Sequence, residues 1–152
     1  MDAKIEQLTE AEHDWIQQQI ALAQSFVLDM LGVSEGELPS PEELDRAFTA
    51  WLPEHDPAEA NAIVNCVGVA LGQHIVARSG LEWVIASDKY GTELAVYGLP
   101  GRGDVLLYPQ NLVAKRYEKR STPFVVDLIN KLCGDIAKVQ HQKDQKKWWK
   151  PW

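Results

Sequence analysis

The side chains that could act as nucleophiles or bases are scattered along this chain. A nucleophilic site needs Ser or Cys, a base and an orienting group close together. Cys66 and His74 lie eight residues apart on one predicted helix, and a rise of about 1.5 Å per residue separates them by about 12 Å along its axis. They cannot form a dyad, and no GxSxG motif is present. We therefore predict no catalytic residue.

Metal-ligating residues show no clustering either. Zinc sites require His, Cys or carboxylate side chains at short, repeated spacings, whereas the four histidines are far apart and there is no CxxC motif. Cys66 and Cys133 each lie on the apolar side of a predicted helix, which is typical of reduced, buried thiols. We expect no metal and no cofactor. We interpret His74 as a helix residue bonded to a backbone or carboxylate group, with a binding role as the alternative.

Charge is distributed unevenly along the chain. Residues 1–60 hold fourteen acids and two bases, a net charge of −12, and residues 61–152 hold eight acids and thirteen bases, a net charge of +5, which together give −7. A surface of one sign favours partners of the opposite sign. An alternative that stays open is ion pairing between the two parts. The acids that we expect to bind a basic partner are Glu10, Glu12, Asp14, Glu42, Glu43 and Asp45.

Basic residues gather in two places. Lys115 and Arg116 close the central region, and residues 143–152 combine four lysines with three tryptophans, among them Trp148 and Trp149. Lysine with interleaved aromatic residues suits single-stranded nucleic acid, but the net charge of −7 and the lack of a reader motif make nucleic acid the least favoured partner. We expect this tail to dock on its own domain or, as the next alternative, to bind a protein, which could be a second copy.

Helix caps position these residues. Thr9, Ser40 and Asp56 are N-cap residues, and the helices that they open are expected over 10–31, 41–52 and 57–79. The third helix is apolar on most of its circumference, which is typical of a helix at the centre of a fold. Gly68 and Gly72 share one of its faces and should allow close approach of another element, in our interpretation the sheet.

Three short strands follow that helix. Residues 81–87, 93–98 and 104–108 are apolar runs separated by glycine-containing turns, which predicts an antiparallel three-stranded meander. Trp83 should lie where the meander meets the apolar helix. We interpret 111–120 as a helical turn. Thr122 should cap a last helix that begins at Pro123 and ends at about Gln140.

These elements predict a single α+β domain over 1–142. It comprises an acidic helical part (1–60, where 1–8 add a turn), the central apolar helix with the meander (61–120) and a C-terminal helix (121–142). The basic Trp-rich tail occupies 143–152. The N-terminus lacks the pattern of a secretory signal, and no run of 18 apolar residues is present. We therefore expect a cytoplasmic protein without membrane contact.

The central region combines a glycine-containing apolar helix, the sequence GLEWV at 80–84, Asp88 with Gly91, a hydrophobic hairpin, Pro109 and Lys115-Arg116. By these elements it resembles an uncharacterised bacterial domain family, catalogued as a domain of unknown function. The resemblance covers about residues 61–119 and brings no catalytic residues with it. It implies a small α+β fold and a bacterial source. In size and acidity the chain is also similar to immunity proteins that neutralise secreted bacterial toxins.

The sequence thus favours a non-enzymatic protein-binding module. In its sharpest form this is an immunity-type protein whose acidic N-terminal helices cover a basic site on a toxin. Two alternatives stay open. One is a small-ligand-binding protein or enzyme with a pocket between sheet and helices near Trp83, His74 and Tyr97. The other is a homodimeric structural protein held together by its Trp-rich tail.

Overall fold

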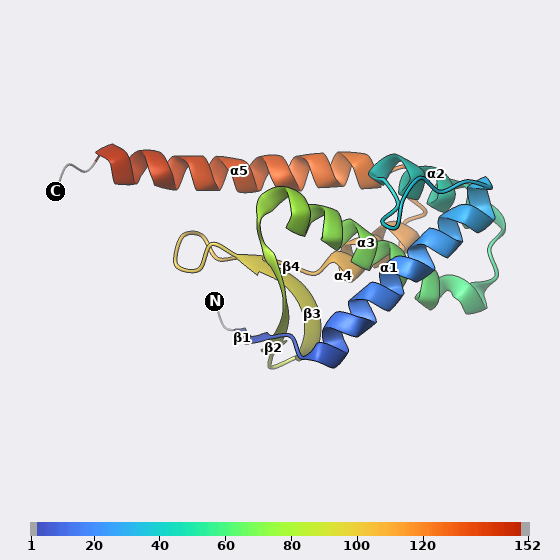
Figure 1. The fold of residues 1–152 in the computed structure, drawn as a ribbon, viewed down its shortest axis with the longest axis horizontal. Helices are drawn as coiled ribbons and strands as arrows, with labels where there is room; N and C mark the ends of the chain where they lie inside the picture. Colours follow the sequence, from blue (N-terminus) through green and yellow to red (C-terminus); the bar gives the residue numbers. More distant parts are fainter. Residues whose placement is uncertain (1–2, 150–152) are drawn as a thin grey trace.

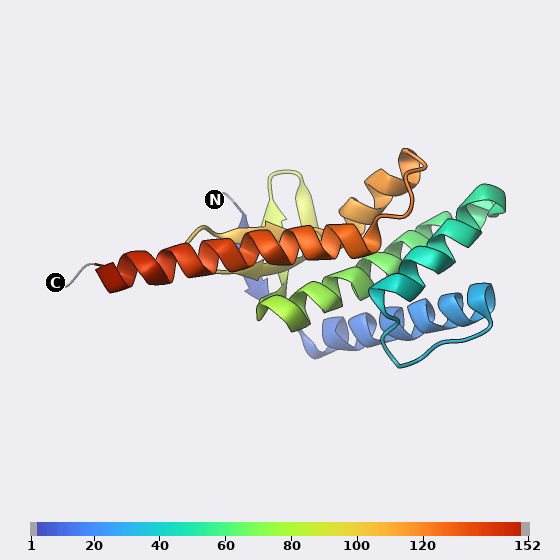
Figure 2. The ribbon, with the colours of Figure 1, turned by 90° about the horizontal axis from the view of Figure 1, so that it is seen from above.

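The computed structural model describes residues 3–149, and the side chains of residues 3–141. This part of the chain forms five α-helices and one antiparallel sheet in the order β1-β2-β3-β4, so the α+β class is confirmed. Figures 1 and 2 show α1 and α3 together on one side of the sheet. The elements are β1 (Lys4–Gln7), α1 (Glu10–Leu31), α2 (Pro41–Trp51), α3 (Ala60–Ser79), β2 (Glu82–Asp88), β3 (Gly91–Gly98), β4 (Val105–Leu107), α4 (Pro109–Glu118) and α5 (Val125–Trp149), with single 3-10 turns at Leu52–Glu54 and Pro57–Glu59.

The sheet has four strands, so the prediction of a three-stranded meander was wrong by one strand. The N-terminal segment Lys4–Gln7, interpreted as a turn, forms β1 and pairs antiparallel with β2, where Ile5 lies opposite Ala86. Ile5 is the only large apolar side chain among these four residues, which is too few to show the alternation of a strand. The strand exists because β2 offers it a partner edge, far away in sequence.

Helix α3 lies at the centre of the fold, and its two glycines meet different neighbours. A Cβ atom on Gly72 would lie only 2.7 Å from Cζ2 of Trp83 and 2.8 Å from Cγ of Pro109. Trp83 therefore packs at the junction of sheet and helix, as predicted. A Cβ atom on Gly68 would lie 2.7 Å from Cα of Gln110. This glycine admits helix α4 rather than the sheet.

Helix α5 is capped by a residue from another helix. Its first backbone N–H groups, in residues 124–126, donate to the carboxylate of Asp45 over 2.8, 2.6 and 2.9 Å. Thr122 was expected to be the cap, but its hydroxyl pairs with the hydroxyl of Thr49. The helix begins at Val125, later than expected, because the cap is supplied across the core by α2.

Helix α5 also continues to Trp149, beyond its expected end at Gln140. Its apolar periodicity stops there, but 141–149 hold no glycine or proline and are rich in good helix formers such as Lys and Gln. Figures 1 and 2 show the C-terminal part of α5 projecting past the sheet as a straight rod.

The stretch Pro57–Ser79 is long and apolar enough to cross a membrane by length and composition, with a mean hydropathy of 1.4, whereas the sequence analysis expected no span. Half of the 18-residue window that meets this criterion is buried inside the fold. The core helix of a globular domain meets the same criterion, so the observation is weak evidence for a span.

Candidate functional site

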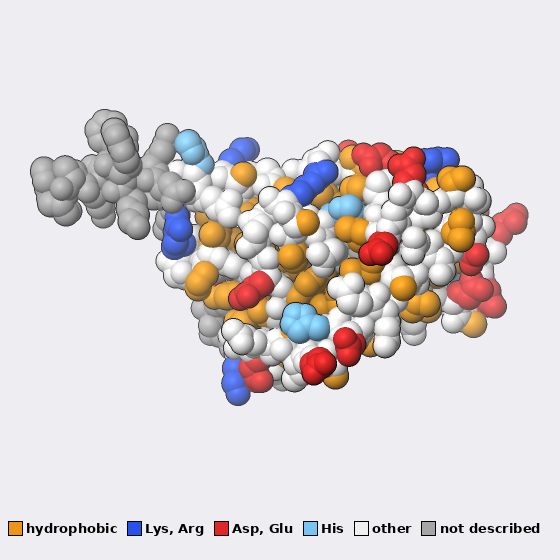
Figure 3. All heavy atoms as spheres, viewed as in Figure 1, with side chains coloured by type: hydrophobic (Ala, Val, Ile, Leu, Met, Phe, Trp, Pro, Cys, Tyr) orange, Lys and Arg blue, Asp and Glu red, His pale blue; other side chains and the backbone are white. Residues whose placement is uncertain are grey.

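The exposed acids of the predicted binding surface lie on α1 and α2. Glu10, Asp14 and Glu42 are exposed, and Glu12 is half-buried with its carboxylate accepting the Thr9 N–H at 2.7 Å. On the face shown in Figure 3, most Asp and Glu side chains lie over α1, α2 and their connection. Most Lys and Arg side chains lie over the other half of that face. The uneven charge distribution of the sequence is therefore also present on this face of the molecule.

The other two acids of that predicted surface belong to the interior. Asp45 is 8% exposed, and its carboxylate accepts backbone N–H groups at the start of α5. Glu43 is 6% exposed, and its two oxygens accept the backbone N–H groups of Ser40 at 3.0 Å and Glu35 at 3.2 Å. Their oxygens are satisfied inside the chain, so these two residues are not available to a partner at the surface.

The pocket expected near His74, Trp83 and Tyr97 is not formed by these three residues together. His74 Nε2 is bonded over 2.7 Å to the carbonyl oxygen of Pro39, before α2, which confirms a helix histidine with a backbone partner. The indole N–H of Trp83 donates to Gln73 Oε1 at 3.0 Å on the inner side of the sheet. Tyr97 packs on the opposite face of the sheet with the cluster of Val84, Ala86 and Ala95.

The predicted basic residues also separate. Lys115 and Arg116 are in the last turn of α4. Lys115 borders a cavity with β4, whereas Arg116 borders a different one beside Pro123. The side chains of Trp148 and Trp149 lie outside the described residues.

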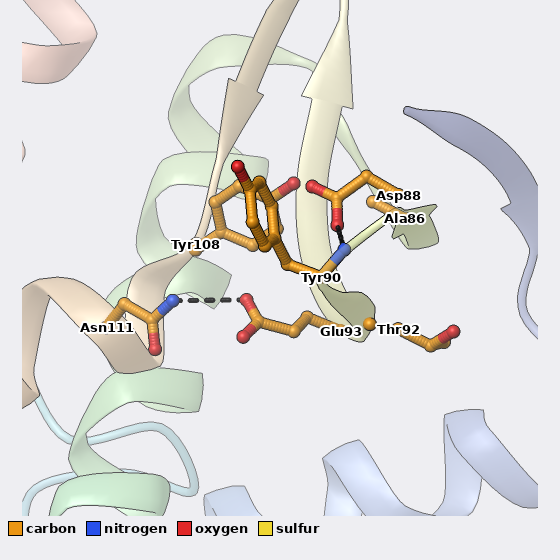
Figure 4. A pocket seen from close by; sticks show the side chains of 8 residues that line it. Ala86, Asp88, Tyr90, Thr92, Glu93, Tyr108 and Asn111 are labelled. Carbon is orange, nitrogen blue, oxygen red and sulfur yellow. Dashed lines mark hydrogen bonds between the residues drawn. The ribbon is translucent and has the colours of Figure 1, made fainter. Parts of the chain in front are cut away.

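A groove that the sequence analysis did not identify lies where the β2–β3 turn faces the start of α4 (Figure 4). Its cavity has a volume of about 210 Å³. Two carboxylates, two phenol rings and one amide line it. We call the residues that carry these groups the acidic groove: Asp88, Tyr90, Glu93, Tyr108 and Asn111.

Local structure places each groove residue. Asp88 ends β2, and its Oδ1 accepts the N–H of Tyr90 at 2.7 Å, which holds the turn. Tyr108 directly precedes the first residue of α4, and the Asn111 amide donates to Glu93 Oε2 at 3.1 Å. Each carboxylate thus has one such bond. Among residues 3–141, neither is within ion-pair distance of a Lys, Arg or His side chain.

The two carboxylates of the groove affect a neighbouring phenol. Partial burial, and then the nearby charges of Asp88 and Glu93, raise the pKa of Tyr108 above its ordinary value. The Nζ of Lys89 lies 5.1 Å from the ring centroid of Tyr90, a side chain that is 84% exposed. The turn therefore already holds one cation against a groove ring. Carboxylates beside phenol rings favour a cationic group, by charge and by cation–π attraction.

Two further cavities adjoin the acidic groove and share Tyr108 and Asn111 with it. One, of about 360 Å³, includes Trp15 of α1, which is 37% exposed. The other, of about 450 Å³, lies between the edge strand β4 and helix α4. We call this second one the leucine cavity, because Leu106, Leu107 and Leu112 line it.

The remaining chemically competent groups stay apart from the groove. Cys66 is buried in α3, its thiol is 3.4 Å from the carbonyl oxygen of Ile63, and burial raises its pKa to about 12. Both cysteines are free, as expected, and Cys133 is partly buried. In the described part of the chain, no three His, Cys, Asp or Glu residues gather in a way that could hold a metal ion.

Comparison with known proteins gives one match. A family model described as "Domain of unknown function (DUF3806)" matches residues 44–128, more than half of the chain. This region includes the 61–119 segment of the predicted resemblance and adds α2 from residue 44 onward and the first turn of α5. Its two ends meet where Asp45 caps residues 124–126. No curated protein and no solved structure matches the chain.

Proposed function

The chain belongs to the DUF3806 family, and we propose that it is a non-enzymatic module that binds a basic segment of a protein partner in the acidic groove. The observation that carries this proposal is the pair of carboxylates, Asp88 and Glu93, without a cationic partner among the described residues, in one cavity with two tyrosines. An immunity-type protein that neutralises a basic toxin is one case of this function.

The composition of the groove supports a protein ligand. Tyrosine and tryptophan are enriched among the side chains that dominate protein–protein binding energy, because they bury a large area at a small entropy cost. Tyr90, Tyr108 and Trp15 are such side chains at a concave surface. The exposed acids of α1 and α2 add long-range attraction for a basic partner and raise its association rate.

Two acidic surfaces of this chain can be compared directly in one binding experiment. The probe is a fluorescein-labelled twelve-residue peptide of alternating Lys and Leu, and its binding is followed by fluorescence anisotropy at low salt. The groove variant Asp88→Asn/Glu93→Gln should weaken binding about tenfold, because each lost carboxylate–cation contact of this kind contributes roughly 0.5–1 kcal/mol.

The matched control is Glu10→Gln/Asp14→Asn, which removes the same charge from the exposed start of α1. It should change the affinity less than about twofold. Equal losses in the two variants would show that only net charge matters and would overturn the groove as the site. Absence of binding to the unmodified chain, or equal binding of a peptide with Glu in place of Lys, would overturn the proposed function.

A further inference from the structure

The acidic groove has a complementary segment within the same sequence. Residues 143–152 contain Lys143, Lys146, Lys147 and Lys150 against the single acid Asp144, together with three tryptophans. We infer that the groove binds this C-terminal segment of a second copy of the chain. The inference rests on the proposed function, because it names the basic partner.

The groove of the same copy is out of reach of this segment. Helix α5 passes the β3–β4 turn at Val139, since a Cβ atom on Gly103 would lie 3.2 Å from Val139 Cγ1. The groove lies at the other end of β3, which has eight residues and is about 25 Å long at roughly 3.3 Å per residue. Beyond Val139 the helix runs on to Trp149, about 15 Å farther.

That last part of α5 leads away from the molecule (Figures 1 and 2). Residues 150–152 of the segment span at most about 10 Å even when fully extended. They cannot bridge the way back to the acidic groove while α5 stays helical. A second copy avoids this problem, because its own α5 projects into solvent in the same manner.

The chemistry of the two surfaces matches at more than charge. Lysine ammonium groups fit Asp88 and Glu93 beside the rings of Tyr90 and Tyr108. The adjoining leucine cavity, of about 450 Å³, offers the apolar side chains of Leu106, Leu107 and Leu112 to tryptophan rings, which contribute to interfaces through the large apolar area that they bury. The two kinds of side chain lie close together in the segment, as Lys146-Lys147-Trp148-Trp149-Lys150, and the two cavities are neighbours that share Tyr108 and Asn111.

A contact between the groove of one copy and the segment of another allows two kinds of assembly. If each of two copies places its segment in the other's groove, the complex closes into a two-fold dimer; if the exchange does not close, chains add head to tail. In both cases the groove and the segment are mutually dependent. Substitution of either should abolish the association.

The test measures the mass of the full chain by size-exclusion chromatography with light scattering, at about 100 μM and low salt. We expect a mass of at least twice the 17.1 kDa of one chain. The groove variant Asp88→Lys/Glu93→Lys and the tail variant Lys146→Glu/Lys147→Glu should each be monomeric, with a dissociation constant raised at least tenfold. The control Glu10→Lys/Asp14→Lys, which reverses the same number of charges away from the groove, should still associate, with a dissociation constant raised less than about threefold, because these acids add only long-range attraction.

Mixing the two variants shows whether they are monomeric because the contact is lost or because the chain is unfolded. A mixture of groove and tail variants should form a complex, because one intact groove meets one intact tail, and the chain with both charge reversals should regain self-association. A monomeric unmodified chain, or an assembly that survives the groove variant, would overturn the inference. If the chain is monomeric while the Lys-Leu peptide still binds, the proposed function stands and the inference of self-association fails. If the chain neither self-associates nor binds the peptide, the inference and the proposed function both fail.

Discussion

Asp45 and Asp88 are the same residue type in one chain, and their surroundings give them opposite roles. Asp45 is 8% exposed, and three backbone N–H groups of α5 occupy its carboxylate. Asp88 is exposed at the end of β2, and one oxygen accepts a single N–H from its own turn. The first aspartate joins two helices of the interior, whereas the second leaves a carboxylate facing a surface cavity.

The difference teaches how to interpret an acidic sequence. Counting charges placed the binding surface on residues 10–45, where acids are most frequent. Yet two of the six acids chosen there are structural, and the cavity that is lined by two carboxylates and two tyrosines comes from the less acidic part of the chain. A carboxylate indicates a binding site when the described part of the chain leaves its charge unpaired. Substitution of a structural acid such as Asp45 should therefore lower stability, whereas substitution of the groove carboxylates should weaken binding and leave stability nearly unchanged.

The largest effect on stability is expected for Asp45→Ala. The change leaves three N–H groups at the start of α5 without their acceptor and should lower the free energy of unfolding by about 3 kcal/mol. Urea unfolding followed by circular dichroism measures it. The control Glu42→Ala, an exposed neighbour, should cost less than about 0.5 kcal/mol. Similar midpoints for both variants would contradict the capping role.

Gly68→Ala should lower both the stability of the fold and peptide binding in the acidic groove. Its new methyl group would meet the backbone of Gln110 at 2.7 Å, so α4 must move, at a net cost of about 2 kcal/mol. Asn111 sits in the same turn, so Lys-Leu peptide binding should weaken as well. Gly134→Ala is the matched control: no atom lies within 4 Å of the added Cβ, and helix propensity predicts a gain of up to about 1 kcal/mol. Unchanged peptide binding in a destabilised Gly68→Ala would show that the groove does not depend on the α3–α4 contact.

The smallest stability effect is expected for Asp88→Asn/Glu93→Gln, below about 0.5 kcal/mol, because both carboxylates are exposed. The same variant should lower the pKa of Tyr108, since it removes two negative charges that oppose loss of the phenolic proton. An NMR titration of the tyrosine ring signals at alkaline pH measures this shift. Glu10→Gln/Asp14→Asn should leave the Tyr108 titration where it is. An unchanged titration in the groove variant would mean that burial alone raises the pKa.

In the unmodified chain, this raised pKa has a consequence for stability. Above the ordinary tyrosine pKa, near 10, the unfolded chain loses the Tyr108 proton first, while the folded chain retains it. Stability therefore decreases as the pH rises from the ordinary pKa towards the raised one. The groove variant should narrow the pH range over which stability decreases, because it lowers the raised pKa of Tyr108. A series of unfolding curves at alkaline pH measures this range.

Much of the fold follows from the sequence because its determinants are local. Thr9 and Ser40 cap α1 and α2 as predicted, and each forms a capping box, with Glu12 and Glu43. Asp56 caps only the 3-10 turn Pro57–Glu59, where it accepts the N–H of Ala58 at 2.9 Å, and α3 begins later than expected, at Ala60. Gly32 takes a left-handed conformation, with φ of 77°, after the last turn of α1. These signals need only neighbours within four residues. For the same reason the meander strands could be placed from their turns.

The sequence by itself determined the caps of α1 and α2, the central apolar helix, three of the four strands and membership of a family of unknown function. Only the tertiary structure decided the fourth strand, the capping of α5 by Asp45 and the acidic groove. Each of these joins groups far apart in sequence: β1 with β2, α2 with α5, and the β2–β3 turn with α4. No periodicity or spacing records such pairings, because they arise when the sheet and the helices pack together and bring unsatisfied backbone groups and side chains within reach of one another.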